Sequence, residues 1–291
     1  MGLATLALVL SSAVIHATWN LWAKQVGHAA RPAVLMWLLT VVSSLLYAPI
    51  GLWALSHGSW RPTPEVLLWV LGSGGIHVVY FFLLLRGYRV GDLSLVYPVA
   101  RGTGPLLAAV GAIVLLGERP TALSAGGALL IATGVVVLTW RHDRVAQARL
   151  APGLRYGLMT GVLIATYTLF DTWSVKRVGI PPLLFYWGGE VVRVLFVTPL
   201  VVRDAPSISR LWREHRWRVL GIAALSPLSY ILILMALRTG EVGHIAPARE
   251  LSILIGAYLG GRVLGESEHR RRRVAAAAFA LGVIALALAR S

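Results

Sequence analysis

Long apolar runs alternate with short polar connectors along the whole chain. A helix needs about 20 apolar residues to cross the hydrocarbon core of a bilayer, and runs of that kind recur along the sequence. The pattern predicts an all-α integral membrane protein with ten transmembrane helices, at residues 3–23, 33–55, 65–86, 93–116, 122–140, 155–175, 181–202, 218–237, 243–264 and 273–290. Because the connectors are short, they leave no room for a soluble catalytic domain between the spans.

The composition supports a membrane location. Of the 291 residues, 57% are hydrophobic and 13% are charged, which exceeds the apolar content that a soluble core of this length needs. The net charge of +15 would favour a nucleic-acid partner in a soluble protein, but the basic residues cluster between the apolar runs, so we expect none. The sequence has no cysteine, which excludes thiol catalysis, thiolate metal sites and disulfides. We expect neither a metal nor a cofactor.

Lysine and arginine are distributed unevenly between the two sets of connectors. The connectors after odd-numbered spans hold 17 basic residues, whereas those on the opposite face hold 6. Dense positive charge is retained on the cytoplasmic side of a membrane, which places the odd connectors in the cytoplasm. We therefore expect a multi-pass protein of the bacterial cell inner membrane with both termini on the outer side.

The two halves of the chain repeat one another at a spacing of about 148 to 150 residues. Matched pairs include Pro32 and Pro182, Trp37 and Trp187, Arg89 and Arg238, Pro98 and Pro247, Arg101 and Arg249, and Glu118 and Glu266. Each copy, residues 1–145 and 150–291, holds five predicted spans. Because five is odd, the second copy is inserted upside down relative to the first, which predicts two inverted repeats with a central site between them.

Short motifs within this duplicated frame resemble a known family. Residues 116–119 read Leu-Gly-Glu-Arg at the end of the fourth span, and residues 264–266 repeat Leu-Gly-Glu. Together with the early prolines of spans four and nine, they resemble the ten-helix EamA type of the drug/metabolite transporter superfamily, over essentially the whole chain. The resemblance implies the EamA fold and export or exchange of small metabolites, with the substrate open. Residues 16–20 also resemble a subgroup associated with phosphonate use.

Ionisable side chains inside spans are costly to bury and usually face a cavity or a partner. They are Arg101, Asp171, Glu190, Arg193, Arg249, Glu250 and Arg262. Arg101 and Arg249 occupy matched positions, and each follows a proline that frees backbone carbonyls. Two guanidiniums converging from inverted halves would suit a carboxylate, phosphonate or phosphate. The alternative is that each arginine pairs with an internal carboxylate such as Glu190 or Glu250 and only braces the bundle.

The remaining charged groups are candidates for proton coupling or for ion pairs. Glu190 and Arg193 are three residues apart and share a helix face, which favours a local ion pair and also leaves Glu190 as a proton site. Glu250 points about 100° round its helix from Arg249 and could brace another helix. Asp171 lies nearer the outer end of its span, where it could reach water.

Polar and aromatic side chains on two other spans are candidates for lining a cavity. His16 and Asn20 are four residues apart and share one face of the first span, with Trp19 beside them. His77 and Tyr80 are three residues apart on the third span. We predict that these five residues contribute to substrate binding, although a buried histidine bonded to a neighbouring helix fits the same pattern. The matched pair Glu118 and Glu266 could form gate salt bridges.

These features predict an alternating-access secondary transporter that carries a small polar metabolite, anionic or zwitterionic, through a central cavity. A proton-coupled exporter of cationic drugs and a flippase of a lipid-linked sugar remain the alternatives. An enzyme is disfavoured because Ser73 and His77 share one helix and the sequence holds no zinc or phosphate-loop motif. We expect the substrate and the lipid bilayer as partners, and a monomer or homodimer. Little extramembrane chain is left for a receptor or scaffold.

Overall fold

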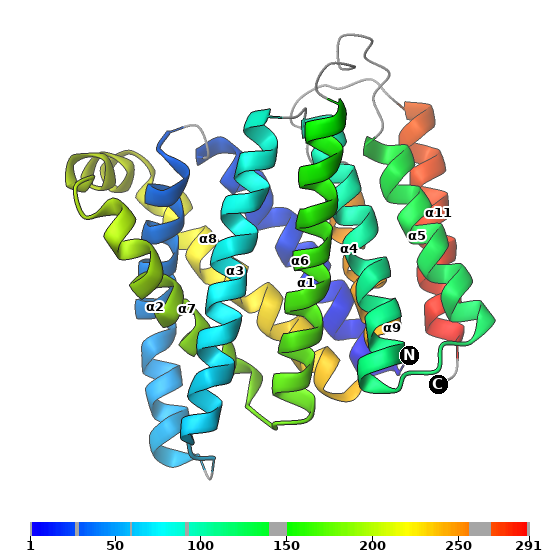
Figure 1. Cartoon of the computed structure of the whole chain (residues 1–291), viewed down its shortest axis with the longest axis horizontal. Helices are drawn as coiled ribbons and strands as arrows, with labels where there is room; N and C mark the ends of the chain where they lie inside the picture. The colour runs from blue at the N-terminus through cyan, green and yellow to red at the C-terminus, as the bar shows by residue number, and fades with distance from the viewer. Residues whose placement is uncertain are drawn as a thin grey trace.

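The computed structural model describes residues 2–26, 29–58, 60–90, 93–139, 150–255 and 269–289. These residues form ten helices: α1 (Leu3–Val26), α2 (Pro32–His57), α3 (Pro64–Val90), α4 (Leu93–Leu116), α5 (Ala122–Thr139), α6 (Leu150–Lys176), α7 (Pro182–Val201), α8 (Ala205–Thr239), α9 (Val242–Arg249) and α11 (His269–Leu288). Each predicted span overlaps one of them, which confirms the all-α prediction. Both ends of the chain lie at the same end of the bundle (Figure 1).

Six of the helices are long and apolar enough to cross a membrane: α1, α2, α3, α4, α7 and α8. Within α5 and α11, shorter apolar stretches cover Ala122–Val137 and Val274–Leu288. The helix α6 is not among the six, and it carries Arg155, Asp171 and Lys176. The apolar helices make this a multi-pass membrane protein.

The helix α8 begins 13 residues before the predicted span at 218–237. Its backbone leaves the helical region at His215, with φ −130° and ψ 16°, so that residues 205–214 form a separate segment that turns away from the bundle (Figure 1). Leu211 is buried beneath this segment, whereas Trp217 beyond the kink is exposed. A hydrophilic connector was expected here, but the buried Leu211 gives the segment an apolar side that packs as a helix.

The helix α9 stops after eight residues although the predicted span continues to residue 264. Pro247 lacks an N–H group and its ring clashes with the preceding turn, which weakens the helix at this point. The amide of Glu250 bonds to the Pro247 carbonyl and the amide of Ile253 bonds to the Glu250 carbonyl, both over three residues. Residues 251–255 are helical again. The α-helix is therefore interrupted at Glu250, within a predicted span.

The helices α2 and α7, which come from different halves, pack against each other as an antiparallel pair. On α2 and α7, the indole N–H of Trp37 donates to Thr198 Oγ1 at 2.8 Å, and that of Trp187 donates to the Ser44 carbonyl at 3.0 Å. The start of α2 therefore contacts the end of α7, so the two helices run in opposite directions. In the same way, Glu118 lies against the start of α9 and Arg101 against its end.

The pair α5 and α11 is also antiparallel and packs closely. A Cβ atom added to Gly134 would lie 2.9 Å from Phe279, and one added to Gly127 would lie 2.8 Å from the Gly282 carbonyl. Small residues let helix backbones approach in a membrane, where packing rather than the hydrophobic effect holds helices together. These two helices form one end of the molecule (Figure 1).

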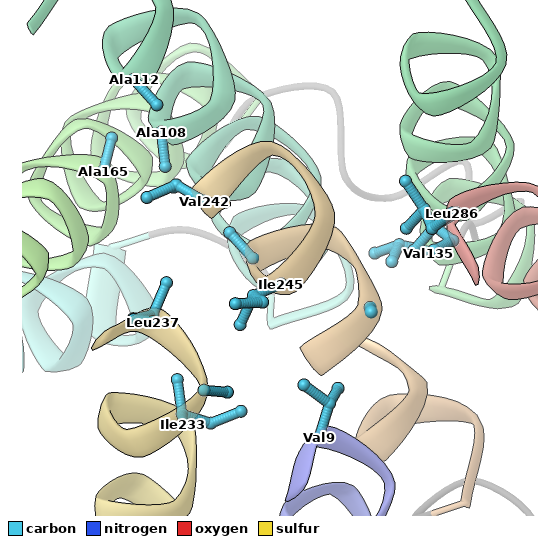
Figure 2. Packing of buried hydrophobic residues seen from close by; sticks show 14 of the residues in the cluster. Val9, Ala108, Ala112, Val135, Ala165, Ile233, Leu237, Val242, Ile245 and Leu286 are labelled. Atoms are coloured by element: carbon cyan, nitrogen blue, oxygen red, sulfur yellow. The ribbon is translucent and has the colours of Figure 1, made fainter. Parts of the chain in front are cut away.

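Buried apolar side chains from five helices meet around α9. Val9 of α1, Ala108 of α4, Ala165 of α6, Leu237 of α8 and Ile245 of α9 are directed toward one another (Figure 2). Both Val9 and Ile245 are fully buried. This cluster fixes the start of α9 between the two halves and so places its broken end next to the polar groups described below.

Candidate functional site

Arg101 of α4 and Arg249 of α9 converge on one carboxylate. Arg101 Nε lies 3.2 Å from Glu250 Oε2, and Arg249 Nε lies 3.7 Å from Glu250 Oε1. Glu250 is the residue at which α9 is broken, and only 1% of its side chain is exposed. The structure thus brings the two matched arginines together and also pairs both with Glu250, as the bracing alternative required.

Arg249 is buried, yet its polar contacts are long. Its side chain is 6% exposed, and its Nη2 lies 3.5 Å from the hydroxyl of Tyr167. Among the described residues its Nε has no hydrogen-bond partner, because the contact with Glu250 is too long for one. A buried guanidinium that is incompletely bonded needs an explanation, and a bound anion is one.

His16 of α1 extends the arginine pair on the α4 side. Its Nε2 lies 3.5 Å from Arg101 Nη2, and its ring meets Trp19 edge to face at 4.7 Å. The Trp19 indole N–H donates to Ser229 Oγ of α8 at 3.3 Å. Asn20 donates to the His16 carbonyl of its own helix at 3.0 Å. The structure therefore brings His16 and Trp19 to the arginines, while the hydrogen bond that Asn20 donates stays within α1.

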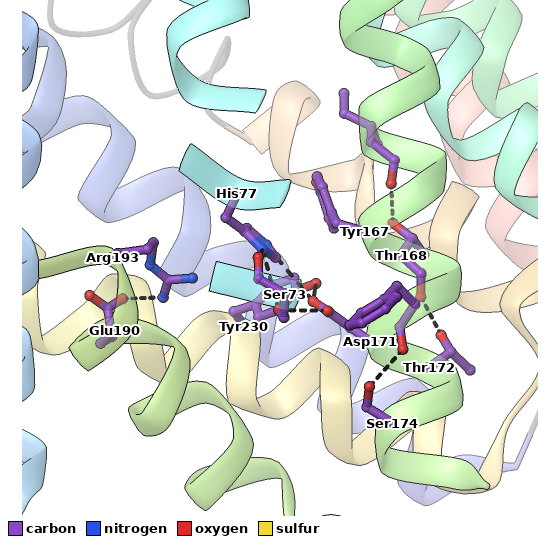
Figure 3. A network of polar contacts seen from close by, with 12 residues as sticks. Ser73, His77, Tyr167, Thr168, Asp171, Thr172, Ser174, Glu190, Arg193 and Tyr230 are labelled. Carbon is purple, nitrogen blue, oxygen red and sulfur yellow. Dashed lines mark hydrogen bonds and ion pairs between the residues drawn. The ribbon is translucent and has the colours of Figure 1, made fainter. Parts of the chain in front are cut away.

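A second polar cluster is centred on Asp171 of α6 (Figure 3). The hydroxyl of Ser73 on α3 donates to Asp171 Oδ1 at 2.7 Å, and that of Tyr230 on α8 donates to Oδ2 at 2.6 Å. His77 Nε2 lies 3.8 Å from Oδ2. The expectation that Asp171 could reach water is wrong, because its side chain is 0% exposed. It faces α3 and α8 instead of the aqueous end of its helix.

The geometry of the same cluster argues against Ser73 as a nucleophile. In a nucleophile–base pair the histidine nitrogen accepts the serine hydroxyl proton. Here the Ser73 hydroxyl donates to Asp171, while His77 Nδ1 lies 2.9 Å from the Ser73 carbonyl and 3.5 Å from Ser73 Oγ. The geometry is that of a hydrogen-bonded carboxylate rather than of an activated hydroxyl.

Aromatic rings connect the two clusters. The ring of Tyr167 lies 4.5 Å from that of His77 and 5.9 Å from the guanidinium carbon of Arg249. Tyr80, predicted to line the site, meets Tyr167 edge to face at 5.4 Å. Tyr167 was not predicted as a site residue, although the repeat contained the signal, since it matches Trp19 in the other half. Nothing in the pattern singled out Tyr230.

Glu190 and Arg193 of α7 form the expected local ion pair. Arg193 Nη2 donates to Glu190 Oε1 at 2.7 Å, and both side chains are buried. The guanidinium also lies over the ring of Tyr186 at 5.0 Å. In Figure 3 this pair lies on the side of His77 away from Tyr167. The local ion pair is therefore formed, while Glu190 Oε2 is buried without a hydrogen-bond partner among the described residues.

The predicted gate residue Glu118 contacts backbone rather than a basic side chain. Its Oε1 accepts a hydrogen bond from the Val242 amide at 2.7 Å, and Oε2 accepts one from the Gly243 amide at 3.0 Å. These amides open α9, where the helix dipole favours negative charge. Glu118 thus joins the end of α4 to the start of α9. Its matched residue Glu266, like Arg262, lies outside the described residues.

A bundle of apolar helices that encloses charged and aromatic groups defines the class of polytopic membrane proteins with a buried polar centre. The sequence profile of the EamA-like transporter family, which is part of the drug/metabolite transporter superfamily, matches residues 3–140, so the first half of the chain is similar to that family. A solved crystal structure aligns with 98% of this chain and 98% of its own at 18% identity and a TM-score of 0.77, and so shares the fold. Comparison with curated proteins found no match.

Proposed function

We propose that this protein is an alternating-access secondary transporter of small anionic or zwitterionic metabolites. The observation that carries the proposal is the convergence of Arg101 and Arg249, from matched positions of the two repeats, on Glu250 at the break of α9. Interrupted helices near the middle of a membrane commonly line the substrate sites of transporters.

The charge at this point favours an anionic group in the substrate. Arg249 shares Glu250 with Arg101, and among the described residues its buried Nε has no hydrogen-bond partner, which is unfavourable for a guanidinium. A carboxylate or phosphonate would supply acceptors, and Arg249 presents several donors to such a group. An adjacent cavity, lined in part by Arg101, Pro247 and Glu250, has a volume of about 10 Å³, which is too small for a metabolite. We therefore infer that the substrate site is closed in this conformation.

Reciprocal contacts support an inverted-repeat arrangement. Trp187 donates to the Ser44 carbonyl, and its match Trp37 donates to Thr198, whose hydroxyl in turn donates to the Val194 carbonyl. Val194 is the residue that matches Ser44 at a spacing of 150. Equivalent groups are therefore linked in both directions across α2 and α7. Such near-symmetry offers two related packings of the halves, one open to each face of the membrane.

The test is binding and uptake of three probes by the purified protein, in detergent and in proteoliposomes. The probes are methylphosphonate as an anion, L-alanine as a zwitterion and tetraphenylphosphonium as a cation. We expect the anion or the zwitterion to bind. Loss of about 2 kcal/mol of charge-assisted bonding in Arg249→Gln should weaken binding about 30-fold. Arg249→Lys should be intermediate, because lysine keeps the charge without the planar fork.

The matched control is Arg61→Gln, which removes an exposed arginine from the connector between α2 and α3. It should bind the probes like the unaltered protein. Glu250 keeps Arg101 as a partner in Arg249→Gln, and gel filtration checks that the variant remains folded. Binding of tetraphenylphosphonium alone, unaffected by Arg249→Gln, would refute the anion proposal and favour export of cationic drugs.

A further inference from the structure

Asp171 is a buried carboxylate without an arginine or lysine beside it. Among the described residues, the basic nitrogen within 4.0 Å of its oxygens is His77 Nε2, at 3.8 Å. The two other carboxylates in the centre differ, because Glu190 pairs with Arg193 and Glu250 pairs with two arginines. The hydroxyls of Ser73 and Tyr230 stabilise negative charge on Asp171 only in part. A full charge here is costly, and a proton would remove it.

The histidine tautomer leaves two acceptors facing each other. His77 Nδ1 lies 2.9 Å from the Ser73 carbonyl, which can only accept, so this nitrogen carries the hydrogen. The Nε2 atom of a neutral ring then presents a lone pair to Asp171 Oδ2. Two lone pairs at 3.8 Å gain nothing from the contact. One proton on either atom turns it into an attractive contact and allows the pair to close to hydrogen-bond distance.

The groups around this pair determine its electrostatics. Ser73 and His77 approach Asp171 from α3, and Tyr230 approaches from α8. At longer range, the guanidiniums of Arg193 on α7 and Arg249 on α9 add positive potential. Glu190 differs from Asp171 because its Oε1 accepts a hydrogen bond from Arg193 at 2.7 Å, which favours its charged form.

The pair lies at a joint between the two halves. Asp171 on α6 of the second half is bonded to α3 of the first half through Ser73 and to α8 of its own half through Tyr230. Protonation of one carboxylate oxygen would oblige the hydroxyl on that oxygen to turn and accept. The strength of a bond between α3 and α6 therefore depends on whether the proton is present. Any rearrangement of the halves during transport changes this joint.

The Asp171–His77 pair is also connected to Arg249, through the ring of Tyr167. Tyr167 contacts the His77 ring on one side and Arg249 on the other. An anion that draws Arg249 toward itself would move the Tyr167 hydroxyl contact at 3.5 Å and so the ring against His77. This gives a short physical path between two separate binding events.

We propose that Asp171 and His77 form the binding site for one transported proton, held between Oδ2 and Nε2. The proton comes from the aqueous phase on one side and leaves to the other side when the halves exchange their packing. The proton thus becomes the coupling ion of the transporter. This inference rests on the proposed function for its role in transport, but the proton site itself can be measured without a substrate.

The first experiment is infrared difference spectroscopy of the purified, substrate-free protein during a pH titration. We expect the C=O bands of protonated carboxyl groups to grow reversibly as the pH falls, with one component that comes from Asp171. This component should be missing in Asp171→Asn and altered in His77→Gln. Glu65→Gln, which removes an exposed acid from the start of α3, is the matched control and should keep the Asp171 component. A titration that is identical in Asp171→Asn would overturn the proposal.

The second experiment measures tracer methylphosphonate and L-alanine in proteoliposomes. With one proton coupled per substrate, a gradient of one pH unit drives accumulation of at most about tenfold. We expect this accumulation to fall to onefold in Asp171→Asn, with tracer exchange in the absence of a gradient retained. Accumulation that persists in Asp171→Asn would refute proton coupling at this site while leaving the proposed function intact. A titrating Asp171 band without transport of either probe would refute the proposed function and the coupling role together, but not the proton site.

Discussion

The contact between Glu118 and α9 provides the sharpest test of how the two halves are joined, because its effect can be measured without a substrate. Its carboxylate accepts the amides of Val242 and Gly243 at the start of α9. Hydrogen bonds to a charged group contribute about 1.5 to 3 kcal/mol each, and a carboxylate near a helix N-terminus adds about 0.3 to 1 kcal/mol. Allowing for water that replaces part of this in an open state, we expect Glu118→Ala to destabilise the junction by about 2 to 4 kcal/mol.

This free energy converts into a population that can be measured. A shift of 1.4 kcal/mol changes an equilibrium constant tenfold, so 2 to 4 kcal/mol should raise the open fraction of the junction by about 30-fold to several hundredfold. The chain has no cysteine, so a single reporter thiol is selective. Val242→Cys places that thiol at a fully buried position beside Glu118.

The assay is the rate of maleimide labelling of the reporter in proteoliposomes. We expect Glu118→Ala to accelerate labelling of the cysteine at position 242 by at least tenfold, and Glu118→Gln to have a smaller effect because its amide oxygen still accepts one bond. A second reporter, Leu286→Cys, is buried against α5 and should be unaffected. Equal rates with and without the Glu118 carboxylate would show that the contact does not hold the junction closed.

Two further predictions concern packing. Gly161→Val should lower the yield of folded protein and its melting temperature in detergent, because even a Cβ at this position overlaps the hydroxyl of Thr103 on α4. The control is Gly126→Ala, whose added Cβ meets open space and should leave both quantities unchanged. Trp187→Phe removes a donor to the Ser44 carbonyl and should lower the free energy of unfolding by about 0.5 to 1.5 kcal/mol in a denaturant titration. An unchanged midpoint would show that this hydrogen bond does not stabilise the packing of α2 and α7.

The helices were predictable because hydropathy reports directly on the lipid that surrounds them. The bounds of α4 agree with the predicted segment, and those of α2 and α7 lie within two residues of it. Two departures have local causes that hydropathy does not register. The helical segment 205–214 follows from an apolar side that holds Leu211, and the break after Arg249 follows from Pro247.

The sequence identified most polar residues of the site from their place inside spans, and only the repeat indicated that Arg101 and Arg249 meet. Matching the two halves identified Arg101 and Arg249, and the same match held an unused signal for Tyr167 through Trp19. The contacts of Asp171 were not predictable, because they depend on which faces of α3, α6 and α8 meet. A carboxylate placed by sequence alone at the outer end of a span was expected to reach water, whereas helix packing buries it.

If the proposed function holds, the arrangement of charge in the centre accounts for two separate sites. If Asp171 lay beside Arg249, the two would neutralise each other, and neither an anion nor a proton would be bound with any advantage. The structure instead separates them by the ring of Tyr167 and gives Glu250 two arginines while Asp171 has none within 4.0 Å among the described residues. An anion would bond to the buried donors of Arg249, and a proton would remove the charge of Asp171. Binding of both would therefore lower the cost of changing the packing of the centre within the membrane.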